Sequence, residues 1–204
     1  MENTIKTNYI TTRAMILIAL LGALSAVLMV LEFQIPFSPT FAKFDFSDLP
    51  VILGAFLLGP VAGIIIAFMK ILLNFVLNGT TTMFVGEFAN LILTLTFILP
   101  ASIIYKRNKT KLTAIKGLII SVILTSLLAI ILNIYLIFPV YAFLFGINIG
   151  DIVQMAVITN PLVHDTITMV IFSLLPFNIL KYTIISVMTV MSYKKLSFLF
   201  KKEY

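Results

Sequence analysis

Residues 117–138 read GLIISVILTSLLAIILNIYLIF, a run of 22 residues without a charged side chain. As a helix this run is about 33 Å long, enough to cross the roughly 30 Å hydrocarbon core of a bilayer. The whole 204-residue chain has the same character, since 61% of its residues are hydrophobic, 11% are charged and the mean hydropathy is +1.15. A soluble globular protein is excluded, and the sequence predicts an all-α, polytopic membrane protein.

Five further apolar runs complete a predicted single domain over residues 1–204 with six transmembrane helices. The predicted spans are 14–32, 49–58, 61–77, 86–105, 117–138 and 176–193. Gly59-Pro60 separates the second and third spans as a helical hairpin. The run 162–175 contains His164 and Asp165, and is predicted to be a short helix that does not span. Pro139 is expected to end the fifth span, and Pro176 to begin the sixth.

The basic residues predict the orientation of these helices, because cytoplasmic loops hold the excess of lysine and arginine. With both termini in the cytoplasm, inner segments hold eleven of the 14 basic residues: Lys6, Arg13, Lys106, Arg107, Lys109, Lys111, Lys116, Lys194, Lys195, Lys201 and Lys202. The outer segments then hold only Lys43. The basic excess therefore indicates membrane orientation and contact with anionic lipid rather than nucleic-acid binding.

Several kinds of chemistry are missing from the sequence. There is no cysteine, so disulfides, thiol catalysis and cysteine-ligated metals are absent. The single histidine, His164, has no second ligand at metal-binding spacing, so no metal site and no catalytic residues are predicted. No Gly-x-x-x-x-Gly-Lys-Ser/Thr motif is present, and an ATPase or another enzyme is not expected.

Lys181 is the polar residue that most needs an explanation, because a lysine at mid-helix costs about 2.5–3.5 kcal/mol on insertion scales. If the sixth helix begins at Pro176, Lys181 lies roughly 8 Å below its outer end. Asn178 is on the same face, three residues earlier. The two side chains either serve a ligand or are a lysine that reaches the headgroups and an asparagine that starts the helix.

Other polar residues occur at a similar outer depth in the fourth and fifth spans. Glu87, Asn90 and Asn133 are there, and aromatic residues including Phe41, Phe44 and Tyr141 lie at the same level. Each amide alone fits a hydrogen bond between helices, and the aromatics fit an interfacial belt. Together they predict an outward-facing pocket for a flat, hydrogen-bonding solute.

Two further features have both a structural and a functional interpretation. Lys70 and Asn74 in the third span favour a structural hydrogen-bonded role or a contact between subunits. The first span carries two small-xxx-small pairs, Ala19 with Ala23 and Gly22 with Ala26, which allow another helix to approach closely. That helix belongs either to this chain or to a partner.

These residues resemble the riboflavin-binding substrate (S) components of energy-coupling-factor (ECF) vitamin transporters, over nearly the whole chain. The resemblance rests on Ile35-Pro-Phe-Ser-Pro39, Phe44-Asp-Phe-Ser-Asp-Leu-Pro50, Leu58-Gly-Pro-Val-Ala-Gly63, Phe88-Ala-Asn90, Ile131-Leu-Asn133, Pro139-Val-Tyr141 and Pro176-Phe-Asn-Ile-Leu-Lys181. The stretch between the fifth and sixth spans, around residues 148–168, is longer than in the family pattern.

The resemblance implies that the first outer loop closes over a pocket that binds riboflavin as transported ligand, with no cofactor. The residues it implicates, together with the pocket candidates above, are Thr40, Phe41, Ala42, Lys43, Phe44, Asp45, Glu87, Asn90, Asn133, Tyr141, Asn178 and Lys181. It also implies that Ala19, Gly22, Ala23 and Ala26 dock on a transmembrane T component, which works with two ATPase subunits.

The expected function is therefore riboflavin capture at the bacterial plasma membrane for ATP-driven uptake. Two alternatives remain open: an S component for another vitamin, such as folate, thiamine or pantothenate, and a purely structural membrane subunit.

Overall fold

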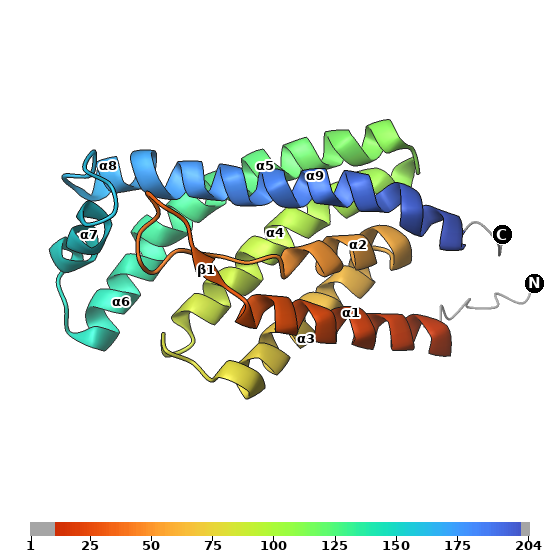
Figure 1. Cartoon of the computed structure of the whole chain (residues 1–204), viewed down its shortest axis with the longest axis horizontal. Coiled ribbons are helices and arrows are strands. Elements are labelled where there is room, and N and C mark those ends of the chain that lie inside the picture. The colour runs from red at the N-terminus through yellow and green to blue at the C-terminus, as the bar shows by residue number, and fades with distance from the viewer. Residues whose placement is uncertain (1–10, 201–204) are drawn as a thin grey trace, which may run out of the picture.

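The computed structural model describes residues 11–200, and the side chains of residues 11–192. Three of the basic residues predicted to lie in the cytoplasm fall outside the described residues: Lys6, Lys201 and Lys202. The described chain is a helical bundle with one small hairpin of strands, which lies within residues 31–47 (Figure 1). Its elements are α1 Thr12–Val30, β1 Phe33–Gln34, β2 Lys43–Phe44, α2 Asp48–Leu58, α3 Pro60–Asn78, α4 Val85–Arg107, α5 Lys111–Leu132, η1 Asn133–Ile137, α6 Phe138–Phe145, α7 Ile149–Val157, α8 Thr166–Met169, η2 Val170–Leu174 and α9 Leu175–Phe200.

Five helical stretches of the described chain are long and apolar enough to cross a membrane. They are Thr12–Val30, Pro60–Asn78, Val85–Arg107, Lys111–Phe145 and Thr166–Ser192. The predicted spans therefore have long helices at five of six positions.

The sixth predicted span, residues 49–58, folds as α2, which has 11 residues and is about 16 Å long. It is too short to cross a bilayer core by itself. Residues 50–56 are all buried, because α2 packs against α1, α3, α4 and α9. The expected hairpin is confirmed, since Gly59, with φ of 100°, turns the chain and Pro60 begins α3.

Small residues let neighbouring helices approach closely, as is common in membrane bundles. A side chain at Gly63 would place its Cβ 2.6 Å from the Ala55 Cβ, and one at Gly117 would lie 2.9 Å from the Ala101 carbonyl oxygen. Helix α2 therefore packs directly on α3, and α5 on α4.

Pro139 and Pro176 each lie inside a continuous helical stretch, Lys111–Phe145 and Thr166–Ser192, so the prediction that Pro139 ends a helix and Pro176 begins one was wrong. A π-helical segment precedes each proline: η1 leads into α6, and η2 joins α8 to α9. The N–H of Phe138 donates to the Asn133 carbonyl and the N–H of Leu175 to the Val170 carbonyl, five residues back. The wider π turn accommodates a ring that an ordinary helix would not. Residues 162–175 are accordingly no separate short helix.

The carbonyl that Pro176 leaves without its helical partner is satisfied by a side chain. Because proline has no N–H, the Phe172 carbonyl four residues earlier loses its usual donor. Asn160 Nδ2 donates to this oxygen at 2.9 Å, and to Ser173 Oγ at 3.0 Å. Asn160 lies in the longer segment between α6 and α8, which also contains the short helix α7. This segment therefore stabilises the π turn of the last helix.

The bundle has two distinct ends (Figure 1). The start of α1, the α2–α3 and α4–α5 connections and the end of α9 lie at one end. The strands, the α3–α4 connection and α6 to α8 lie towards the other. The α4–α5 end carries the basic stretch from Lys106 to Lys116, so charge and geometry agree on which segments share a side.

We expect Asn160→Leu to lower the free energy of unfolding by about 1–3 kcal/mol, because it leaves buried polar groups unmet. In a Pro176→Ala background the loss should be smaller, since residue 176 then has an N–H for the Phe172 carbonyl. Thermal unfolding of the four proteins in detergent measures this coupling. Equal losses in both backgrounds would contradict this account of the π turn.

Candidate functional site: a polar cavity beneath the first outer loop

The connection between α1 and α2, residues 31–47, is an ordered hairpin, and it is called the first outer loop after the orientation that the sequence predicts. Its strands pair antiparallel, with Phe33 opposite Phe44 and Gln34 opposite Lys43. The rings of Phe33, Phe44 and Phe46 pack together, with centroids 5.0–6.3 Å apart. Lys43 forms an ion pair with Glu32 across the hairpin. Local pairing therefore fixes the loop shape before any ligand is considered.

The tip of this loop is also held by hydrogen bonds. Ser38 is fully buried, and its Oγ lies 2.8 Å from the Ile35 carbonyl oxygen and 3.1 Å from that of Ala42. Phe37 beside it adopts a left-handed backbone, with φ of 67°. The segment Ile35 to Ala42 is thus a compact turn.

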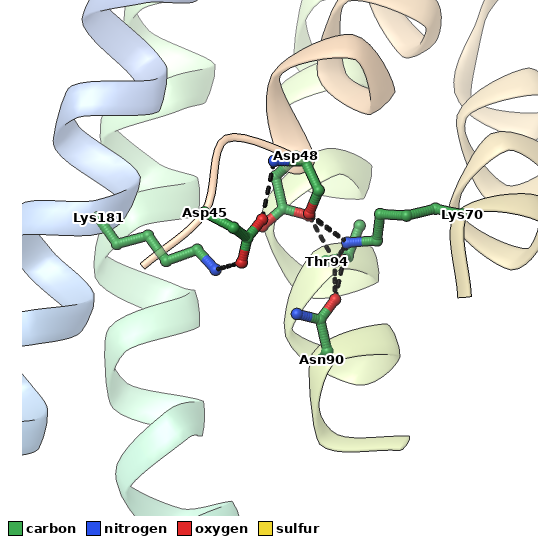
Figure 2. Close-up of polar contacts among 7 residues, drawn as sticks. Asp45, Asp48, Lys70, Asn90, Thr94 and Lys181 are labelled. Carbon is green, nitrogen blue, oxygen red and sulfur yellow. Dashed lines mark hydrogen bonds and ion pairs between the residues drawn. The ribbon is translucent and has the colours of Figure 1, made fainter. Parts of the chain in front are cut away.

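Asp45 joins the loop to the last helix (Figure 2). Its Oδ2 accepts a hydrogen bond from Lys181 Nζ at 2.8 Å, and its Oδ1 accepts one from the Ser47 N–H at 2.8 Å. Burial would raise the pKa of Asp45, but the charges of Lys181 and Lys70 and hydrogen bonding from the Lys181 and Ser47 side chains hold that pKa below its ordinary value. Asp45 therefore stays ionised at neutral pH. Its contribution to stability is lost only as the pH falls through this lowered value.

Lys70 forms a second buried cluster, on the other side of the same segment (Figure 2). Its Nζ lies 2.7 Å from Asp48 Oδ1, 2.7 Å from Asn90 Oδ1 and 2.8 Å from Thr94 Oγ1, with Ser47 Oγ at 3.2 Å. Lys70 is completely buried. This cluster ties α2, α3 and α4 together and shows the hydrogen-bonded role that the sequence favoured for Lys70.

The same cluster fixes the direction of the Asn90 amide. Asn90 Oδ1 accepts from Lys70, so the amide nitrogen points away from the ammonium (Figure 2). Asn90 thereby presents a hydrogen-bond donor on its free side.

A polar cavity of about 400 Å³ lies beneath the loop, between it, the C-terminal part of α3 and the N-terminal part of α4. This volume falls within the range of small-molecule sites. Its lining residues are Met29, Glu32, Thr40, Phe41, Lys43, Asp45, Asn74, Asn78, Gly79, Thr81, Thr82, Gly86, Glu87, Asn90 and Tyr141. Seven of the twelve predicted ligand residues therefore line this one cavity: Thr40, Phe41, Lys43, Asp45, Glu87, Asn90 and Tyr141.

The other five predicted ligand residues do not line this cavity. Phe44 is buried within the ring cluster of the hairpin, and Ala42 is half-buried beside it. Asn133 and Asn178 donate through Nδ2 to the carbonyls four residues back, at 2.7 and 2.8 Å. Lys181 reaches the cavity only through Asp45.

A second, apolar pocket of about 300 Å³ adjoins the first. It is lined by Phe41, Phe138, Tyr141, Phe145, Ile147, Ile152 and Met155. Phe41 and Tyr141 line both spaces, so the polar cavity has an aromatic side towards α6.

Three residues were not assigned to this site from the sequence. Asn74 lines the cavity, and Asp48 and Thr94 belong to the Lys70 cluster that supports it. A sequence signal existed for Asp48, because a buried lysine at 70 requires an anion. Its partner could not be identified without the fold.

The small residues of α1 divide between two environments. Ala19 and Ala23 are exposed on the bundle surface, whereas Gly22 and Ala26 are buried. A Cβ at Gly22 would lie 3.0 Å from the Met69 Cβ, so this position packs inside the chain against α3. Only the alanine pair is accessible to another protein.

Comparison with known proteins shows which protein family the chain belongs to. The family model "ECF transporter, substrate-specific component" matches residues 13–193, and the chain belongs to this family. It is thus the substrate-specific subunit of a transporter rather than an enzyme, and a multi-pass protein of the bacterial plasma membrane.

Two individual relatives and one solved structure are similar to the chain over most of its length. The chain is 34% identical over 197 residues to "Riboflavin transporter RibU" of Staphylococcus aureus, covering 97% of each chain. It is 32% identical to "Riboflavin transporter FmnP" of Bacillus subtilis, over 90% of this chain and 92% of that one. A solved structure described as "Structure and mechanism of the S component of a bacterial ECF transporter" superposes with a TM-score of 0.72 at 35% identity, covering 93% of this chain and 98% of that chain.

We expect Lys70→Met to lower the free energy of unfolding by about 3–5 kcal/mol, because it strands the buried Asp48 carboxylate. Asp48→Asn combined with Lys70→Met should recover most of this loss, since no unpaired charge then remains in the cluster. Unfolding midpoints in detergent measure both. A double variant no more stable than Lys70→Met would show that the ion pair is not what holds the cluster.

Proposed function

We propose that this chain is the riboflavin-binding S subunit of an ECF transporter. The support that carries the proposal is the cavity beneath the first outer loop, whose wall combines aromatic rings with amide, hydroxyl and carboxylate groups. Two relatives that share about a third of their residues with this chain over nearly full length are named riboflavin transporters.

The chemistry of the cavity matches that of the vitamin. Riboflavin is uncharged, with a flat ring system bearing carbonyl acceptors and a chain of hydroxyl groups. Phe41 and Tyr141 offer stacking surface, Asn90 offers a donor, and Glu87 offers an acceptor for hydroxyl groups. The loop contributes Thr40, Lys43 and Asp45.

The five predicted residues that do not line the cavity support the residues that do. Lys181 holds Asp45 in place and, with Asn178, completes the side of the site formed by α9. Asn133 stands in η1, where the fifth span widens, and contributes the side formed by that segment. Ala42 and Phe44 shape the loop that covers the ligand.

The orientation follows from charge. We infer that the cavity end faces outward and that both termini lie in the cytoplasm, because the basic α4–α5 connection and the chain ends share the opposite end of the bundle (Figure 1). In this arrangement α2 is the sixth membrane element, embedded among its neighbours rather than crossing alone.

Transport then requires partners. The chain has no nucleotide-binding motif, so energy comes from two ATPase subunits acting through a transmembrane T component. The exposed Ala19 and Ala23 of α1 form the surface on which the T component docks.

The first test is ligand binding. The purified protein should quench riboflavin fluorescence stoichiometrically and leave folate, thiamine and pantothenate unbound in a competition assay. Lys181→Ala and Asn133→Ala should each weaken riboflavin binding by about 1–3 kcal/mol, the cost of an unmet polar partner. Lys116→Ala and Asn108→Ala, both at exposed positions, are matched controls. A wild-type protein that does not quench, or unchanged affinity in both site variants, would refute the corresponding assignment.

The second test separates binding from transport. Leucine at Ala19 and Ala23 should leave riboflavin affinity unchanged but abolish uptake by cells or proteoliposomes that contain the complete transporter. Val76→Phe, at another exposed position in a membrane-spanning helix, should leave both unchanged. If the alanine variants lose binding, these positions serve folding of the chain rather than docking.

A further inference from the structure

One face of α3 carries three polar residues, Lys70, Asn74 and Asn78, at intervals of four. Residues with this spacing lie one above the other on a helix. Lys70 is inside the buried cluster, whereas Asn74 and Asn78 line the cavity. The face therefore runs from the centre of the bundle to the cavity.

Asn74 is the unusual member of this series. Asn74 is buried, with a relative exposure of 4%, and its Nδ2 has no hydrogen-bond partner within the described part of the chain. Burying an amide without a partner is costly, so a structural role would require an acceptor that the fold does not supply.

Two asparagines of other membrane-capable helices behave differently. Asn133 and Asn178 each donate to the carbonyl four residues back in their own helix. Asn74 makes no such bond, although the Lys70 carbonyl occupies the equivalent position. A helix can thus satisfy an asparagine internally, and at Asn74 it does not.

The surroundings of Asn74 indicate which part of a ligand would meet it. Asn78, Thr81 and Thr82 lie on the same cavity wall, and Thr82 Oγ1 donates to Glu87 Oε2 at 2.6 Å. Asn74, Asn78 and Thr81 line this cavity but not the adjoining apolar pocket, and Thr82 is hydrogen-bonded to the Tyr141 hydroxyl, so Thr82 lies where the polar lining meets the Tyr141 ring. The rings of Phe41 and Tyr141 belong to the side shared with the apolar pocket.

We propose that Asn74 is a ligand-contacting residue that hydrogen-bonds the hydroxyl chain of the bound flavin and so selects flavins that carry such a chain. The proposal rests on the proposed function and deepens it. In this arrangement the ring system lies towards Phe41 and Tyr141, and the hydroxyl chain extends along α3. A hydroxyl both donates and accepts, so it satisfies either end of the Asn74 amide.

The experiment compares two ligands in two proteins. Riboflavin carries the hydroxyl chain, and lumiflavin has the same ring system with a methyl group in its place. Asn74→Leu should weaken riboflavin binding about fivefold to a hundredfold, the range expected for one buried polar contact, and leave lumiflavin binding unchanged. Fluorescence titration measures both affinities.

Stability without ligand provides the second readout. Asn74→Leu removes an unmet amide, so the ligand-free variant should unfold at or above the temperature of the wild-type protein. Thr125→Val is the matched control, because Thr125 Oγ1 is also buried without a partner in the described chain but lies on α5, away from the cavity lining. It should change neither affinity.

The outcomes separate the two proposals. A wild-type protein that binds neither flavin overturns the proposed function and this inference with it. A wild-type protein that binds riboflavin, with Asn74→Leu equal to it, overturns the inference alone. Equal weakening of riboflavin and lumiflavin, or a lower unfolding temperature of the ligand-free variant, assigns Asn74 to the structure instead.

Discussion

Two buried ion pairs meet at one short segment, and the architecture of the site depends on them. Asp45 pairs with Lys181 of α9, and Asp48 pairs with Lys70 of α3. In an apolar bundle, separating either pair leaves an uncompensated charge, which is far more costly than losing an exposed salt bridge. Residues 45–48 are therefore held from both sides, and they set the position of the loop before them and of α2 after them.

These two ion pairs explain why the first outer loop forms a fixed wall of the cavity. The hairpin is shaped locally by strand pairing and ring packing, but Asp45 places it over α3 and α4. The opposite wall is fixed by the same charges, since Lys70 turns the Asn90 amide. Any outward displacement of the loop at Asp45 must break its bond to Lys181, so access to the cavity and the electrostatics of the core are linked.

The sequence predicted the large features of the fold because they follow from composition. Five long apolar helices, the Gly59-Pro60 hairpin and the clustering of seven loop and helix residues on one cavity were all within reach of hydropathy and resemblance. The predicted helix boundaries at Pro139 and Pro176 were wrong. At Pro176, the carbonyl that lacks a helical donor accepts a hydrogen bond from Asn160, which lies outside the helix, and the local sequence does not show this partner. The pairing of Lys70 with Asp48 could not be predicted from the sequence either, because the two residues are 22 positions apart and meet only when α2 packs against α3.

The polar residues at membrane depth illustrate why residue type alone did not identify the site. Asn133, Asn178 and Asn74 are chemically the same and similarly placed in apolar helices, yet the first two satisfy their donors within their own helix. What distinguishes Asn74 is the absence of a partner in the described structure, which depends on rotamer and surroundings rather than on sequence. A folded chain retains a buried, unmet amide at a cost to its stability, and such a cost is typical of positions where a ligand supplies the missing bond. Among the cavity-lining residues that the structure describes, Asn74 is the one whose buried side-chain donor has no partner in the protein, and this is why we place a ligand hydroxyl beside it.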